Sequence, residues 1–217
     1  MLEIPHICKC LKIGEFFMRK LLITLLTFLI PMCVFAATYQ QTLVNLNKAM
    51  QGEANASHRY QLYSQKAESE GYTQIAKLFK AISMAESIHL KNHTAALTKL
   101  GGQPETIKYN EVQIDTTREN LAQPIKGETT EAEKMYPQYL QQARQEGAEQ
   151  AIQSFTYALN AEMQHEQLLK DALANFGNNK EMDYCVSNIS GDTRAVLPNQ
   201  QCPVEPDKLE RYARISK

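Results

Sequence analysis

An internal repeat constrains the fold of this 217-residue chain more than any other feature of its sequence. Glu86 and His89 return 76 positions later as Glu162 and His165. The same offset relates a longer set of residues: Tyr60, Ala67, Glu70-Gly71, Phe79 and Ala85 correspond to Tyr136, Ala143, Glu146-Gly147, Phe155 and Ala161. The chain is therefore an internal duplication, and its two halves are expected to fold alike.

Both halves have the composition and periodicity of α-helices. From Tyr39 to about Phe176 the chain is rich in Ala, Gln, Glu, Lys and Leu, and apolar residues recur at three- and four-residue spacing. Breaks fall at Gly71, Gly101-Gly102, Gly147 and Gly177. Two tight turns and one long connection, 101–116, predict an all-α, ferritin-like four-helix bundle made of two antiparallel hairpins joined by a crossover.

The N-terminal segment has the pattern of a secretory signal peptide. Met18-Arg19-Lys20 precedes the apolar run 21–35, and Val34 and Ala36 are small enough for cleavage after Ala36. This predicts translation from Met18 and an exported, periplasmic protein. A membrane anchor is the alternative, but the run is shorter than the ~20 apolar residues of a spanning helix.

Three parts follow from these boundaries: a leader at 1–36, a helical domain at 37–177 and a tail at 178–217. The tail is rich in Asn, Ser, Asp and Pro and contains two cysteines, so we expect it to be made mostly of loops.

Six residues of the helical domain form a candidate metal site. Glu86-x-x-His89 and Glu162-x-x-His165 each place two donors on one helix face. At ~1.5 Å per residue, Glu53 lies roughly 27 Å before the first turn and Glu128 roughly 28 Å before the second, whereas Glu86 and Glu162 lie roughly 22 Å after them. Four carboxylates and two imidazoles are thus expected at one level of the bundle.

Such a cluster needs positive charge, because burying unpaired carboxylates costs several kcal/mol each. No Lys or Arg stands at the matched positions, and mixed carboxylate and imidazole donors suit iron, with manganese as the second choice. The alternative is a solvated polar stripe on helices that pack elsewhere.

The second half differs from the first in two ways near Glu128. It has an additional carboxylate, Glu131, and it has one more residue between Glu128 and Tyr136 than separates Glu53 from Tyr60. Extra residues inside helices often form π-bulges at functional sites, so a π-bulge is predicted between Glu128 and Tyr136.

Four further side chains lie near the expected ligands. Tyr60 and Tyr136 are placed to hydrogen-bond ligand carboxylates, although simple core packing would also explain them. His58 and His93 fall outside the repeat, and we expect them to be surface histidines or histidines satisfied in the core.

These motifs resemble the rubrerythrin family over roughly Thr42 to Ala174, above all in Gly127-Glu128-Thr129-Thr130-Glu131 running on to Met135-Tyr136-Pro137. The resemblance implies a pair of non-haem iron ions that reduces hydrogen peroxide to water, and dimers or larger homo-oligomers. It also implies a ligand set: Glu53, Glu86, Glu128, Glu131, Glu162 and His165, with His89 binding in one redox state. Tyr60 and Tyr136 would steady the carboxylates.

The tail departs from this family. Rubrerythrins commonly end in a rubredoxin-like domain whose four cysteines bind one iron and pass electrons inward. Here Asn188 and Glu205 stand where two cysteines are expected, so the tail resembles a degenerate version without that iron. Cys185 and Cys202 are expected to form a disulfide in an oxidising compartment, and the electron donor is expected to be an external molecule.

Peroxide reduction is not the only function that these residues allow. A ferroxidase that oxidises and sequesters iron is one alternative, and a non-catalytic bundle with structural metal is another. Nucleic-acid binding is not expected, because the net charge is −1 and no basic run is present.

Overall fold

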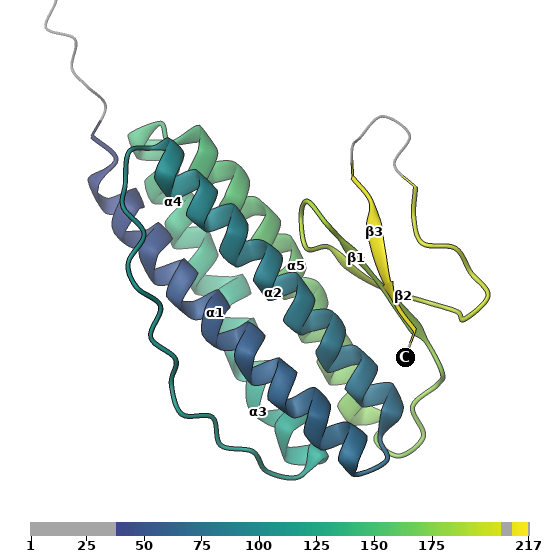
Figure 1. Cartoon of the computed structure of the whole chain (residues 1–217). Helices are drawn as coiled ribbons and strands as arrows, with labels where there is room; N and C mark the ends of the chain where they lie inside the picture. Colours follow the sequence, from purple (N-terminus) through teal and green to yellow (C-terminus); the bar gives the residue numbers. More distant parts are fainter. Residues whose placement is uncertain (1–37, 205–209, 217) are drawn as a thin grey trace, which may run out of the picture. The chain divides into compact units, whose positions relative to one another are not determined.

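The computed structural model describes residues 38–204 and 210–216. The predicted leader lies outside these residues. Figure 1 shows a bundle of long helices followed by a small sheet. Within the described part of the chain, no helix combines the length and the hydropathy needed to cross a membrane.

The helices follow the predicted hairpins. The first hairpin pairs α1 (Gln40–Ser69) with α2 (Thr73–Lys99). In the second, α3 (Thr117–Thr130), η1 (Glu131–Met135) and α4 (Tyr136–Glu146) follow one another as one continuous rod, which pairs with α5 (Glu149–Ala174). Both hairpin turns contain a glycine in the left-handed region, Gly71 at φ 82° and Gly147 at φ 68°.

The predicted π-bulge is confirmed as η1, whose range Glu131–Met135 lies between Glu128 and Tyr136. It absorbs the extra residue of the second half without turning Tyr136 away from the core, where that side chain is fully buried. Pro137 favours a change of register here, because it has no N–H to donate to the turn before it.

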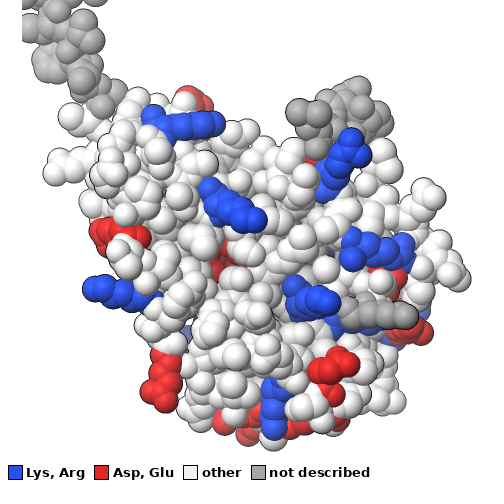
Figure 2. Space-filling view, in the orientation of Figure 1, with Lys and Arg blue, Asp and Glu red and all other residues white. Residues whose placement is uncertain are grey.

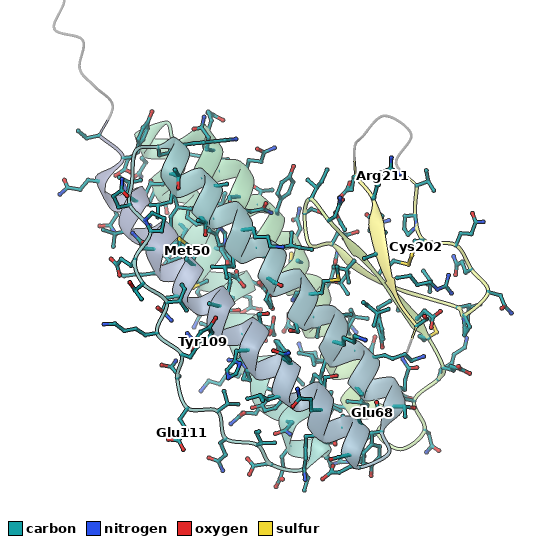
Figure 3. All side chains as sticks on the ribbon, in the orientation of Figure 1. Met50, Glu68, Tyr109, Glu111, Cys202 and Arg211 are labelled. Carbon is teal, nitrogen blue, oxygen red and sulfur yellow. A yellow bond between two sulfur atoms is a disulfide. The ribbon has the colours of Figure 1, made fainter. Side chains whose placement is uncertain are left out.

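The crossover at 101–116 runs along α1 and is fixed by amide side chains. Asn47, Gln51 and Asn55 stand one turn apart on α1, and each accepts a hydrogen bond from a crossover N–H, at 2.9 Å, 2.9 Å and 2.7 Å. Figure 3 shows Tyr109 and Glu111 on this connection beside α1.

A glutamate from each hairpin turn caps a helix of the other hairpin. Glu146 accepts from the backbone N–H of Thr42 at 3.0 Å, near the start of α1. Glu70 accepts from the N–H of Thr117 at 2.8 Å, at the start of α3. The repeated Glu-Gly pairs therefore join the two hairpins as well as turning the chain.

The tail contains a sheet that its composition did not predict. β1 (Asp183–Ser187) pairs antiparallel with β2 (Thr193–Val196) on one side and with β3 (Tyr212–Ile215) on the other. Strands of four or five residues are too short to give a clear alternating pattern. β1 packs on α2, where Gln74 bonds the Tyr184 hydroxyl at 3.1 Å and Lys77 lies 3.5 Å from Asp183.

Charged side chains do not form a large single-sign patch on the face shown in Figure 2, where Lys and Arg are interspersed with Asp and Glu.

Candidate metal centre

The six predicted donors lie in the middle of the bundle because they occupy its apolar stripes. On α1, Glu53 follows Leu46 and Met50 and precedes Tyr60 on the buried face. All six donors are at most 4 % exposed: Glu53, Glu86, His89, Glu128, Glu162 and His165. Helical periodicity thus buries carboxylates at positions that would otherwise hold apolar side chains.

These donors form two overlapping groups, each able to hold one metal ion. Glu53, Glu86, His89 and Glu162 form one, and Glu86, Glu128, Glu162 and His165 form the other. Within each group the ligand atoms lie within 4.8 Å of one another. Glu86 and Glu162 belong to both groups, so each would help to hold both ions.

Each imidazole points one nitrogen into the carboxylates. His89 Nδ1 lies 3.0 Å from Glu86 and 3.8 Å from both Glu53 and Glu162. His165 Nδ1 lies 3.0 Å from Glu162, 3.3 Å from Glu86 and 3.6 Å from Glu128. The two halves therefore present equivalent sets of donors.

The tail covers the opposite nitrogen of each imidazole. His89 Nε2 lies 3.1 Å from the carbonyl oxygen of Ser190, in the turn between β1 and β2. Since a carbonyl only accepts, Nε2 carries the proton and Nδ1 keeps its lone pair for a metal. His165 Nε2 lies 3.5 Å from the Thr193 hydroxyl, which donates to the Gly191 carbonyl at 3.0 Å.

Each tyrosine of the repeat bonds a carboxylate of the opposite hairpin. Tyr60 donates to Glu128, and Tyr136 donates to Glu53. Both phenols are fully buried. Burial, followed by the charge of that carboxylate, raises the pKa of each phenol well above its ordinary value, so both remain protonated donors.

The electrostatics of the donor set call for cations. Burial works to lower the pKa of His89, but hydrogen bonds and charges of Glu53 and Glu86 outweigh it and raise the pKa to about 9. The same balance, with Glu86 and Glu128, raises the pKa of His165 to about 10. Protonated imidazoles are thus the only positive charge that the six donors themselves can supply.

Unpaired oxygen atoms test whether a metal fits. Glu86, Glu128 and Glu162 each have one buried carboxylate oxygen without a hydrogen-bond partner. Buried carboxylate oxygens are seldom left unpaired unless an ion binds them. The donor set therefore fits two ions of the iron and manganese type.

Glu131 is the one predicted ligand outside both groups of donors. It begins η1 and is only partly exposed. Burial and then the charges of Glu128, Glu53 and Glu86 raise the pKa of its carboxyl well above the ordinary value. It therefore lies near the other carboxylates without joining them.

Two residues near the site were not predicted to matter. His93 is fully buried, with Nδ1 2.8 Å from Ser154 and Nε2 3.1 Å from Tyr136. It is a satisfied histidine, as expected, but its place one turn after His89 also brings it to Glu53. The guanidinium of Arg59 lies 5.1 Å from the Tyr60 ring centre. Its position next to Tyr60 in the sequence is the signal that could have predicted this contact. His58 is half-buried, its ring centre lies 5.2 Å from that of Tyr109, and it belongs to neither donor group.

The tail cysteines form a disulfide. Cys185 lies on β1 and Cys202 in the segment after β2, with their Cα atoms 5.6 Å apart. Figure 3 labels Cys202 in this segment. Both described tail cysteines are therefore engaged, and neither has a thiolate free for iron.

Comparison with known proteins agrees with this geometry. Residues 45–173 match the Rubrerythrin family. Rubrerythrin-2 of Clostridium acetobutylicum is 33% identical over 77% of this chain and 94% of its own length. Nigerythrin of Nitratidesulfovibrio vulgaris is 29% identical over 75% of this chain and 81% of its own length.

Solved structures support the fold and the cofactor. A structure of nigerythrin in its fully reduced, all-ferrous state superposes with a TM-score of 0.67 at 29% identity, covering 74% of this chain and 80% of that one. A bacterioferritin of Rhodobacter capsulatus has the same fold, with a TM-score of 0.58 at 23% identity, over 63% of this chain and 85% of its own. The predicted ferritin-like bundle is confirmed, and its buried donor set suits the expected di-iron centre. The chain belongs to the rubrerythrin family.

Proposed function

We propose that this protein is an exported di-iron peroxidase that reduces hydrogen peroxide to water. The observation that carries the proposal is the pair of donor groups sharing Glu86 and Glu162, which would hold two metal ions. When bound in the ferrous state, two iron ions would supply the two electrons and the Lewis acidity that cleavage of one O–O bond requires.

The protein's own residues orient the ligands and exclude water. Tyr60 and Tyr136 hold Glu128 and Glu53 through their hydroxyl protons. Each bond crosses between hairpins, so the carboxylates remain fixed while the charge of the site changes. Glu131 is free to carry a proton or to approach the ions, because it belongs to neither donor group.

A peroxidase needs a source of electrons, and we expect this one to be an external molecule. Asn188 occupies the position of a rubredoxin-like cysteine, and the two described tail cysteines form a disulfide. A tail that holds a disulfide in place of an iron-binding set of cysteines also favours a second candidate, a ferroxidase that oxidises bound iron once without sustained turnover. A homodimer or a larger oligomer is expected by analogy with relatives, and sedimentation analysis tests it.

Anaerobic stopped-flow spectroscopy of the ferrous protein distinguishes the two functions. Faster oxidation by peroxide than by oxygen, at about two irons per chain, and turnover with an added reductant would support the peroxidase. Preference for oxygen and a single round of oxidation would support the ferroxidase. Glu162→Gln should abolish the reaction, whereas Glu166→Gln, one turn further along α5, is the matched control because Glu166 binds Lys170 and Thr129 instead of metal.

Export is supported by the leader pattern and by the disulfide, since disulfides persist in oxidising compartments. The test is N-terminal sequencing of the protein recovered from the periplasmic fraction. A start at Ala37 would support export, and an uncleaved start at Met1 or Met18 in the cytoplasmic fraction would refute it.

A further inference from the structure

The duplicated halves differ in polarity around their two tyrosines. His93 bonds Tyr136 and Ser154 bonds His93, and the repeat places Leu169 and Leu78 at the positions that match this histidine and this serine. Both leucines are fully buried in the apolar cluster that contains Tyr60. The Tyr136 phenol therefore continues into a histidine and a serine, whereas the matching positions in the cluster of Tyr60 hold hydrocarbon and the polar neighbour of the Tyr60 ring is the guanidinium of Arg59.

The hydrogen bonds of this polar chain all run in one direction. The Glu53 carboxylate only accepts, so the Tyr136 hydroxyl donates to it. The phenol oxygen then accepts from His93 Nε2, 3.1 Å away, which leaves Nδ1 unprotonated. Ser154 Oγ lies 2.8 Å from that Nδ1 and donates to it.

The chain leads from Ser154 on α5 to the metal site. Tyr136 and His93 are fully buried, and Ser154 at its outer end retains 4 % exposure. His93 Nε2 is farther from Glu53, at 3.5 Å, than from the phenol, so the phenol is the intermediate step. The two hydrogen bonds of His93 place its ring in the tautomer protonated at Nε2, the form from which a relay by tautomer exchange starts.

We propose that Ser154, His93 and Tyr136 form a proton relay from solvent to the Glu53 side of the di-iron site, with no equivalent on the Glu128 side among the described residues. The inference rests on the proposed function. Peroxide reduction, H₂O₂ + 2 Fe²⁺ + 2 H⁺ → 2 Fe³⁺ + 2 H₂O, consumes two protons, and the relay supplies one of them.

Each transfer conserves charge within the chain. Tyr136 passes its hydroxyl proton to Glu53, which would release it to the water formed from peroxide, and Tyr136 takes the Nε2 proton of His93. His93 takes the Ser154 proton at Nδ1, and Ser154 is reprotonated from solvent. No relay member gains or loses net charge, so no ion has to be buried along the path.

Two substitutions at position 93 separate proton transfer from simple support. His93→Leu copies the residue of the other half and removes the relay. His93→Gln keeps a donor and an acceptor but does not exchange protons as an imidazole does. Both should bind iron at the wild-type stoichiometry and oxidise with peroxide roughly 100-fold more slowly, the scale of assisted proton transfer. His58→Leu is the matched control, since His58 lies outside the site, and should react at the wild-type rate.

A second measurement does not depend on turnover. Nitrogen-15 NMR of the full-length mature protein loaded with Zn²⁺ should show His93 as the neutral tautomer protonated at Nε2. The Nδ1-protonated tautomer would overturn the relay, as would a wild-type oxidation rate in either His93 variant. A wild-type protein inert to peroxide would refute the proposed function and the relay together, whereas a reactive wild type with unaffected variants would refute the relay alone.

Discussion

Replacing Gly191 by alanine should push the tail off the metal site. Gly191 lies in the turn between β1 and β2 at φ 76°, and an added Cβ would lie 2.3 Å from His89 Nε2. Ordinary contact begins at 3.4 Å, so the turn or the imidazole must move by about 1 Å. The Ser190 carbonyl that accepts from Nε2 at 3.1 Å is in the same turn, so this movement breaks its hydrogen bond.

Gly191→Ala should lower the free energy of unfolding for two reasons. An alanine in the left-handed region costs roughly 1–2 kcal/mol, and a buried imidazole N–H without its acceptor costs about 1–3 kcal/mol. Together these lower the free energy of unfolding by about 2–5 kcal/mol. Gly177→Ala is the control, because Gly177 has φ 84° and open space around the added Cβ, so it carries only the first part, roughly 1–2 kcal/mol.

Urea unfolding of the two variants measures this difference, and competition with a chelator measures their affinity for Zn²⁺. Loss of an outer hydrogen bond to a ligand histidine typically weakens metal binding 10–100-fold, so Gly191→Ala should show about that loss and Gly177→Ala none. Equal stability and equal affinity of the two variants would refute the view that the tail orients His89.

Three further predictions concern the bundle, the tail and the metal. The Glu70 bonds to Thr117 and Lys66 lower its pKa to about 2, so its stabilising effect is complete above pH 4.5 and is lost as the pH falls through 2. Urea unfolding should therefore show Glu70→Gln less stable than wild type at pH 7, with a difference that shrinks as the pH falls from 4.5 through 2, and a constant difference would contradict this. Cys202→Ser should lower the free energy of unfolding by about 3 kcal/mol in oxidising buffer, and no change in urea titrations would count against the disulfide. Removing the metal with a chelator should lower the melting temperature reversibly. When the free metal concentration is 100 times its Kd, the metal adds about 2.7 kcal/mol to the free energy of unfolding. Calorimetry that shows an unchanged transition would exclude a bound metal.

The asymmetry of the site has a structural origin in the duplication. Two equal halves would give two equivalent ions, but η1 adds Glu131 on one side and His93 adds a polar chain on the other. The two ions would therefore differ in their access to protons and in their carboxylate surroundings.

The sequence alone determined the bundle, the level of the site and the π-bulge. A repeat of 76 residues restricts the chain to two similar hairpins, and the rise per residue of a helix fixes which glutamates can meet. These inferences depend on helical periodicity, which is local in the sequence. The extra residue before Tyr136 was also visible as a local difference between the halves.

Tertiary structure decided the contacts that cross between elements. The sequence indicated that Tyr60 and Tyr136 reach ligand carboxylates, and the structure decides which ones, because Tyr60 bonds Glu128 and Tyr136 bonds Glu53. Docking of the tail turn on His89 depends on three strands too short to recognise by pattern. Helical spacing gives the height and face of a side chain, but which neighbouring helix it reaches is set by packing, and this packing made His93 part of the site.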